Sequence, residues 1–350
     1  MIHSRNAIAI PPGMTIREQL DNRSMSQKEF ASRMDMSEKH ISRLINGKVE
    51  LSHDVALRLE SVLGIPAKFW NNLEALYREN EARVREELDM EHDEEVAMKM
   101  PYSKCVSFGW LPSAKNNKEK VINLRRFFEV ANLRALEQVK IPGIVYRKAN
   151  SSLSSDYALA MWAQKARTEA RTIKTEPINI QLLKQSLPNI RSLSSTDPSC
   201  FCGEIKSLLA KCGVALVFLP HIKGSFLHGA TFADGNHIVL GLTLRGSYAD
   251  KFWFSLFHEL GHIVCGHITE ITDESESNEE EADRFAQSTL IPNKQYHEFI
   301  ERGGFSQSEI THFSNMIGIA PWIVLGRLQK ENHVPYNHYS SLKVKYAFAD

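Results

Sequence analysis

Residues Phe252–His267 read "FWFSLFHELGHIVCGH", an apolar run that places two histidines and a glutamate in its middle. The bulky aliphatic and aromatic side chains predict a buried helix. Burying His258, Glu259 and His262 costs free energy unless a partner compensates them. The stretch therefore predicts either a group of mutually satisfied polar side chains in the core or a site that holds a ligand.

The letters "HELGH" match the pattern H-E-x-x-H. Residues four apart lie on the same face of a helix, so His258 and His262 can reach one metal ion. Glu259 lies about 100° further around the helix, beside the ion, where it can act on a water molecule. This arrangement predicts a zinc-dependent peptidase in which Glu259 is the general base.

A catalytic zinc ion takes three protein ligands. His267 does not fit the spacing H-E-x-x-H-x-x-G-x-x-H of proteases with a third histidine, since Gly266 and His267 are each displaced by one position. We expect a carboxylate from the next helix instead, namely Glu281, with Glu280 as the alternative. The competing interpretation is that His258 and His262 are satisfied core histidines and that "NEEE" is a solvated charge run.

The composition is that of an ordinary globular protein, with 43% hydrophobic and 24% charged residues. Lysine plus arginine number 42, and aspartate plus glutamate also number 42, so any nucleic-acid surface must be local. The first residues lack a secretory signal pattern, and no run approaches the roughly 18 apolar residues that span a membrane. Five irregularly spaced cysteines favour reduced thiols. We expect a cytoplasmic protein that does not contact membranes.

Short helices with tight turns are predicted between about Thr15 and Leu63. In "SQKEFASRM", Ser26 is an N-cap and Glu29 completes a capping box. A second helix, "SEKHISRLI", begins at Ser37 and ends at the Asn-Gly pair that follows it. Two helices separated by so short a turn predict a helix-turn-helix whose second helix enters the major groove of DNA.

The predicted DNA contacts are the polar positions of this second helix and three flanking residues placed to reach phosphates. They are Gln27, Ser37, Glu38, Lys39, His40, Ser42, Arg43, Asn46 and Lys48. Positive and negative charges are balanced in this region, so a small helical interaction domain is the alternative interpretation.

The chain as a whole is predicted to be a multidomain protein with an all-α N-terminal part and an α+β C-terminal part. "GVALVFL" reads as a buried strand, and "ADGN" is a turn signal between two further strands, "LHGATF" and "HIVLGL". We place a helix-turn-helix domain at 1–80, an acidic helical linker at 81–100, a helical connecting region at 101–199 and a zinc metallopeptidase domain at 200–350.

Two resemblances add to these predictions. "DKFWFSLFHELGH", "EEEADRFAQSTLIP" and "GIAPWIVLGRLQKE" resemble the ImmA/IrrE family of metallo-endopeptidases, roughly from Cys200 to Tyr336. This resemblance implies a compact zincin-like domain with Glu259 as general base and the "HGATF" strand beside the cleft. "HISRLINGKVELSHDVALRLESVLGIPAKFWNNLEALYRE" resembles the Cro/repressor-like domain of HigA-type antitoxins, which implies a homodimer on a palindromic operator.

Two functions follow as hypotheses. In the first, a DNA-binding regulator carries a zinc endopeptidase that cleaves a partner regulator or itself. In the second, an antitoxin represses its operon and neutralises a toxin by binding it, and the zinc domain is sensory or structural.

Overall fold

The computed structural model describes residues 2–3, 8–137, 153–223, 225, 228–244, 247–268 and 276–347. The chain divides into two compact units, Met1–Glu95 and Val96–Asp350. The middle region, 101–199, belongs to the same unit as the C-terminal residues.

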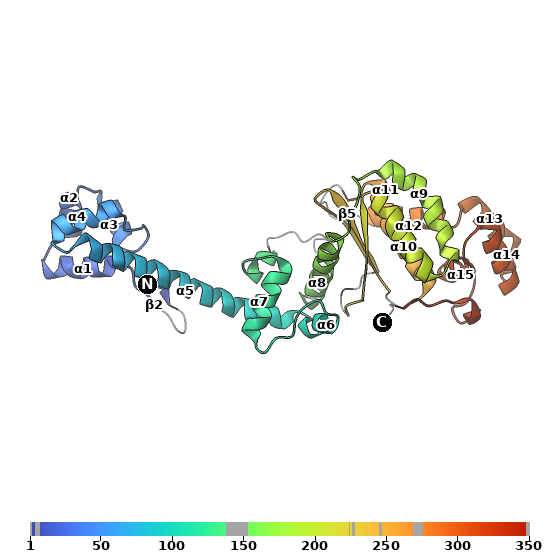
Figure 1. The fold of residues 1–350 in the computed structure, drawn as a ribbon, viewed down its shortest axis with the longest axis horizontal. Coiled ribbons are helices and arrows are strands. Elements are labelled where there is room, and N and C mark those ends of the chain that lie inside the picture. Colours follow the sequence, from blue (N-terminus) through green and yellow to red (C-terminus); the bar gives the residue numbers. More distant parts are fainter. Residues whose placement is uncertain are drawn as a thin grey trace. The chain divides into compact units, whose positions relative to one another are not determined.

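The first unit is a bundle of short helices followed by one long helix (Figure 1). Its elements are β1 (Ile2–His3), β2 (Ile8–Ala9), α1 (Pro12–Asn22), α2 (Gln27–Arg33), α3 (Glu38–Ile45), α4 (His53–Leu63) and α5 (Ala67–Lys99), whose last residues belong to the second unit.

Serine caps set the starts of the three helices in the middle of this bundle. Ser26, Ser37 and Ser52 each accept a hydrogen bond from the backbone N–H three residues later. Such a cap satisfies a donor that the helix leaves unpaired, and contributes about 1 kcal/mol. The Ser26 half of the predicted capping box is present, whereas the Glu29 carboxylate accepts hydrogen bonds from Arg33 one turn on.

The core of the first unit is formed by the apolar faces of its short helices and of the start of α5. Phe30 of α2, Ile41 of α3, Leu59 of α4 and Trp70 of α5 are each 0% exposed, and they belong to one cluster. Burying a side chain of this size stabilises the fold by about 1.5–3 kcal/mol. This packing fixes α2 and α3 against each other and leaves their polar sides at the surface.

The second unit packs helices on both faces of a small sheet (Figure 1). Its helices are α6 (Tyr102–Ser107), α7 (Asn117–Phe128), η1 (Leu133–Glu137), α8 (Leu153–Ala170), α9 (Ile180–Ser192), η3 (Leu193–Ser195), α10 (Pro198–Lys211), α11 (Ala249–Cys265), α12 (Glu276–Leu290), α13 (Asn293–Arg302), α14 (Gln307–Ile317), α15 (Pro321–Lys330) and η4 (Ser340–Leu342). Its strands are β3 (Val214–Leu219), β4 (Gly229–Asp234) and β5 (His237–Thr243).

The strands of this sheet are ordered β3–β5–β4. The β4–β5 hairpin that the "ADGN" turn predicted is present, with Asp234 paired to His237 and Gly235 in the left-handed region at φ 61°. β3 runs parallel to β5. Helix α8 contacts one face of the sheet, while α10 and α11 contact it from the other side (Figure 1).

The structure confirms the predicted fold class, since a helical N-terminal part precedes a mixed α and β part. No described helix combines the length and the apolar content that a membrane crossing needs.

Candidate metal centre and DNA-binding surface

Helix α11 carries the H-E-x-x-H pattern into the core of the second unit. Its apolar residues Trp253, Leu256 and Leu260 are each 0% exposed, which fixes the rotation of the helix. His262 and Glu259 are 7% exposed. The predicted buried helix is therefore present, with Glu259 and His262 buried and His258 partly buried.

The Nε2 atoms of His258 and His262 face each other at 3.1 Å. A carboxylate from α12 completes the group, with Glu279 Oε2 at 3.3 Å from His258 Nε2 and Glu279 Oε1 at 3.4 Å from His262 Nε2. Tetrahedral zinc with bonds of about 2.0–2.1 Å to nitrogen and oxygen holds its ligand atoms about 3.3 Å apart. The donor set His258, His262 and Glu279 thus fits a metal ion in type and in spacing.

The structure brings Glu279 to the histidines, where the sequence led us to expect Glu281 or Glu280. The reason is the rotation of α12, which packs Ala282 at 0% exposure against Gly261 of α11. A Cβ on Gly261 would lie 3.1 Å from the Ala282 Cα, so glycine permits this close approach. Glu279 lies on the same side of α12 as Ala282, whereas Glu281 is rotated about 200° from Glu279.

Asp283 follows Glu279 by one helical turn and also faces α11. Its Oδ1 lies 2.9 Å from His258 Nδ1. A carboxylate on the second nitrogen of a ligand histidine fixes the orientation of the ring and leaves the other nitrogen free to bind a metal. Asp283 was not among the site residues predicted from the sequence, although its spacing of four from Glu279 places both on one face of a helix.

Glu281 belongs to a second group next to the first. His267 Nδ1 lies 3.1 Å from His262 Nδ1, and His267 Nε2 lies 3.4 Å from Glu281 Oε2. Cys265 joins them, with its ligand atom and those of His267 and Glu281 all within 4.8 Å of one another.

Glu259 lies against strand β4. Its Oε2 accepts a hydrogen bond of 2.6 Å from Thr231 Oγ1. Gly229 makes room for it, because a Cβ there would lie 2.7 Å from Glu259 Cγ. Burial raises the pKa of Glu259, while His258 and the Thr231 hydrogen bond act in the opposite direction. Such a carboxylate is a better proton acceptor than one in water.

The carboxylates around His258 favour positive charge at this place. Burial lowers the pKa of His258, but hydrogen bonds to Asp283 and Glu279 outweigh it and raise that pKa to about 10. Hydrogen bonds with His258 and His262 lower the pKa of Glu279, and the hydrogen bond with His258 lowers that of Asp283. The two carboxylates are therefore ionised, as metal binding requires, whereas a bound ion would have to displace the proton of His258.

The predicted DNA contacts lie at the surface of α2, α3 and the residues after α3. Ile41, Leu44 and Ile45 form the buried side of α3, so its polar residues face outward. Eight of the predicted residues are exposed, and they are Gln27, Ser37, Glu38, Lys39, Ser42, Arg43, Asn46 and Lys48.

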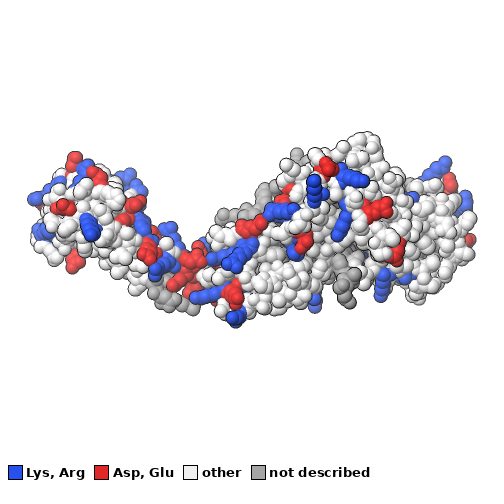
Figure 2. Space-filling view, viewed as in Figure 1, with Lys and Arg blue, Asp and Glu red and all other residues white. Residues whose placement is uncertain are grey.

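Two of the predicted contacts also have roles within the fold. His40 is only partly exposed, and its Nε2 atom is buried without a hydrogen-bond partner in the described residues. Asn46 caps the end of α3, with its Nδ2 donating to the Ser42 carbonyl at 2.7 Å. On the face that Figure 2 shows, basic and acidic side chains are interspersed over this unit.

Comparison with known proteins matches both parts of the chain. A helix-turn-helix family model matches residues 16–70, and a peptidase M78 model, described as the IrrE N-terminal-like domain, matches residues 248–316. The chain is also 38% identical over 63 residues to YddM of Escherichia coli (strain K12), an uncharacterized HTH-type transcriptional regulator. That match covers 18% of this chain and 67% of YddM.

The chain belongs to the helix-turn-helix regulators and carries an IrrE-like domain. A solved structure of an addiction module antidote protein of the HigA family from Coxiella burnetii is 27% identical to it. That match covers 24% of this chain and 94% of the antidote protein, with a TM-score of 0.22. The family models confirm the predicted helix-turn-helix domain and the predicted IrrE-like domain.

Within the IrrE-like match, 248–316, lie helices α11 and α12 with the whole His258, His262 and Glu279 group. The helix-turn-helix match, 16–70, contains α2, α3 and every predicted DNA contact. The regulator therefore has a DNA-binding type of domain and a metallopeptidase type of domain in one chain.

Proposed function

We propose that this regulator binds operator DNA through α3 and that its IrrE-like domain is a zinc-dependent endopeptidase that cleaves a partner regulator or the chain itself. The observation that carries the proposal is the spacing of the three ligand atoms in His258, His262 and Glu279, 3.1–3.4 Å. Glu259 beside them adds the proton acceptor that a peptidase needs.

When bound, the metal would supply a Lewis acid that polarises a carbonyl group and makes water more acidic. Glu259 would take a proton from the attacking water molecule and deliver it to the amine of the departing peptide. Thr231 would hold the Glu259 carboxylate in place through its 2.6 Å hydrogen bond. The β4 edge, which contains Gly229 and Thr231, would hold the substrate in an extended form by pairing with its backbone.

His267 and Glu281 would orient the ring of His262 through a chain of hydrogen bonds. A ring nitrogen that binds a metal carries no proton, so His262 with Nε2 at the metal carries its proton on Nδ1. That proton is donated to His267 Nδ1, and His267 then carries its own proton on Nε2, toward Glu281. In this state His267 Nε2 cannot bind a second ion, so the Cys265 group supports the first site rather than forming another.

On the DNA side, α3 would enter the major groove, with Ser37, Lys39 and Ser42 toward the bases. Arg43 and Lys48 would contact phosphates. A homodimer would place two such helices on the halves of a palindromic operator.

The experiment compares protein termini in cells that produce either the wild-type regulator or its Glu259→Gln variant. Enrichment and mass spectrometry of new protein N-termini report cleavage of any partner as well as of the chain itself. We expect at least one N-terminus that occurs with the wild type and not with E259Q, while both proteins retain zinc. Identical sets of N-termini would refute the peptidase and leave a regulator that acts by binding, such as an antitoxin that neutralises a toxin.

A further inference from the structure

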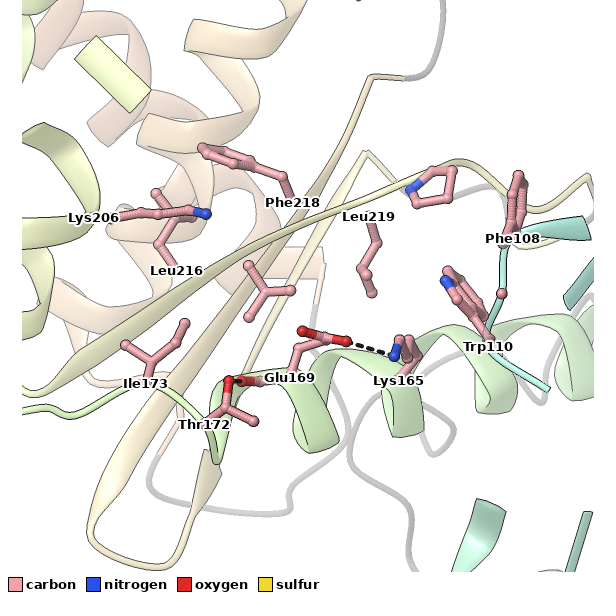
Figure 3. A pocket seen from close by; sticks show the side chains of 13 residues that line it. Phe108, Trp110, Lys165, Glu169, Thr172, Ile173, Lys206, Leu216, Phe218 and Leu219 are labelled. Carbon is pink, nitrogen blue, oxygen red and sulfur yellow. Dashed lines mark hydrogen bonds and ion pairs between the residues drawn. The ribbon is translucent and has the colours of Figure 1, made fainter. Parts of the chain in front are cut away.

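A cavity of about 550 Å³ lies along the outer edge of strand β3 (Figure 3). Its long side is formed by β3 residues 216–219. Helix α8 contributes Lys165 and Glu169, helix α10 contributes Lys206, and the turn after α6 contributes Trp110. This cavity lies on the opposite edge of the sheet from β4, where Glu259 lies.

The edge of β3 offers peptide groups to this cavity. Ile238 N donates to Gly213 O, and β3 and β5 are parallel with Val214 opposite Ile238. In a parallel ladder this register turns every second residue of β3 toward β5 and leaves the N–H and C=O of Leu216 and Phe218 directed outward. In the described sheet β3 has β5 as its one strand neighbour.

Leu216 is 1% exposed, whereas Phe218 is partly exposed, so the peptide group of Phe218 is the one that an incoming segment reaches first. Buried peptide groups are rarely left without a hydrogen-bond partner. Proteins usually cover or interrupt the free edge of a sheet. Here helices α8 and α10 pack on the two faces of the sheet, and the edge of β3 lines the cavity. We call this cavity, floored by β3 residues 216–219, the trough.

The walls of the trough indicate the side chains of such a strand. Phe108 and Trp110 lie near one end of the cavity (Figure 3), and their ring centroids are 5.3 Å apart. Ile173 adds an aliphatic surface. These three side chains favour apolar groups on the part of a bound segment that lies against them, while the rest of the lining is mainly polar.

The charges of the trough favour an acidic segment. Lys165 Nζ and Glu169 Oε1 neutralise each other at 2.5 Å. Lys206 remains, exposed and with its Nζ 5.1 Å from the centre of the Phe218 ring. The three charged groups therefore carry one net positive charge beside the outward peptide groups of β3.

We propose that this trough binds an extended, acidic peptide segment of another protein, which adds to β3 as a further strand. The segment has apolar side chains toward Trp110 and an Asp or Glu toward Lys206. Because this edge is separate from the Glu259 edge, binding requires neither the metal nor cleavage. The trough would hold a partner protein to the IrrE-like domain whether or not that partner is cut.

The test is selection of a phage-displayed library of random octapeptides on the full-length chain, followed by anisotropy titration of a fluorescent synthetic copy of the enriched peptide. We expect peptides with apolar residues and at least one Asp or Glu. The Lys206→Glu variant should weaken binding at least about fivefold, and Trp110→Ala should weaken it similarly. Lys211→Glu is the matched control, since Lys211 is exposed on the same helix outside the cavity, and its affinity should equal that of the wild type.

A second measurement tests strand addition itself. N-methylation of alternate residues in the peptide should weaken binding more than about tenfold in one register and little in the other. E259Q should bind the peptide as the wild type does, which separates this inference from the peptidase. The inference is overturned if no peptide is enriched, if binding is unchanged in K206E and W110A, or if both methylated registers bind equally. It is also overturned if the chain self-associates through this edge and K206E abolishes that association.

Discussion

The choice of Glu279 as third ligand leads to a sharp prediction, because Glu279 and Glu281 lie two residues apart on one helix. Glu279→Gln removes the charge and keeps the shape of the side chain. Its oxygens lie 3.3 and 3.4 Å from the two histidine Nε2 atoms, so the change removes one of three ligands. Glu281→Gln changes a carboxylate whose Oε2 lies 3.4 Å from His267 Nε2, so its effect on the two ligand histidines passes through His267.

The expected magnitudes follow from these positions. Replacing a carboxylate that orients a ligand histidine typically weakens metal binding about 10–100-fold, which is the expectation for Asp283→Asn. Loss of a ligand should exceed that range, so E279Q should weaken zinc binding more than about 100-fold, or roughly 2.7 kcal/mol. E281Q acts through one more hydrogen bond and should cost less than about tenfold.

The assay is competition for zinc between the full-length chain and a chromophoric chelator, with circular dichroism to verify folding of each variant. The predicted order of zinc affinity is wild type, then E281Q, then D283N, then E279Q. If E281Q lost zinc while E279Q kept it, the assignment from the structure would be refuted and the assignment from the sequence restored.

Three further predictions concern packing, thiol reactivity and DNA binding. Gly261→Ala should destabilise the chain by about 1–3 kcal/mol in urea unfolding and weaken zinc binding, because the added Cβ would lie 3.1 Å from the Ala282 backbone; unchanged stability would contradict this packing. Burial raises the pKa of Cys105 to about 12 and thus keeps its thiol protonated, so iodoacetamide at pH 8 should label exposed Cys200 and spare Cys105 until urea is added. Lys48→Ala should lower the slope of log affinity against log salt by about one in anisotropy titrations on the operator; an unchanged slope would exclude a phosphate contact at Lys48.

Many of the helix starts and turns could be predicted because the residues that favour them locally are also compatible with the packing of the core. The caps at Ser26 and Ser37 and the turn at Gly235 each satisfy a local requirement of the backbone, and they lie where the pattern placed them. The helix that carries His258 and His262 was predictable for the same reason, since its spacing of four and its apolar neighbours fix one face.

The glutamate that lies against His258 and His262 could not be predicted from the sequence, because three adjacent glutamates give no information on the rotation of their helix. That rotation is set by contact between Gly261 and Ala282 on two different helices. The position of α8 against the sheet could not be predicted from its local sequence either. Its Trp162 packs against Gly241 of β5, where a Cβ would lie 2.5 Å from the ring, and such long-range contacts leave no pattern within α8 itself.

The central claim is that one metal ion is held by His258, His262 and Glu279. X-ray absorption at the zinc edge of the zinc-loaded chain measures the ligand atoms directly. The account predicts nitrogen and oxygen neighbours at about 2.0–2.2 Å, with the imidazole pattern of two histidines. A sulfur neighbour at about 2.3 Å would place the ion at Cys265 instead, and a chain that retains no zinc would contradict the metal centre altogether.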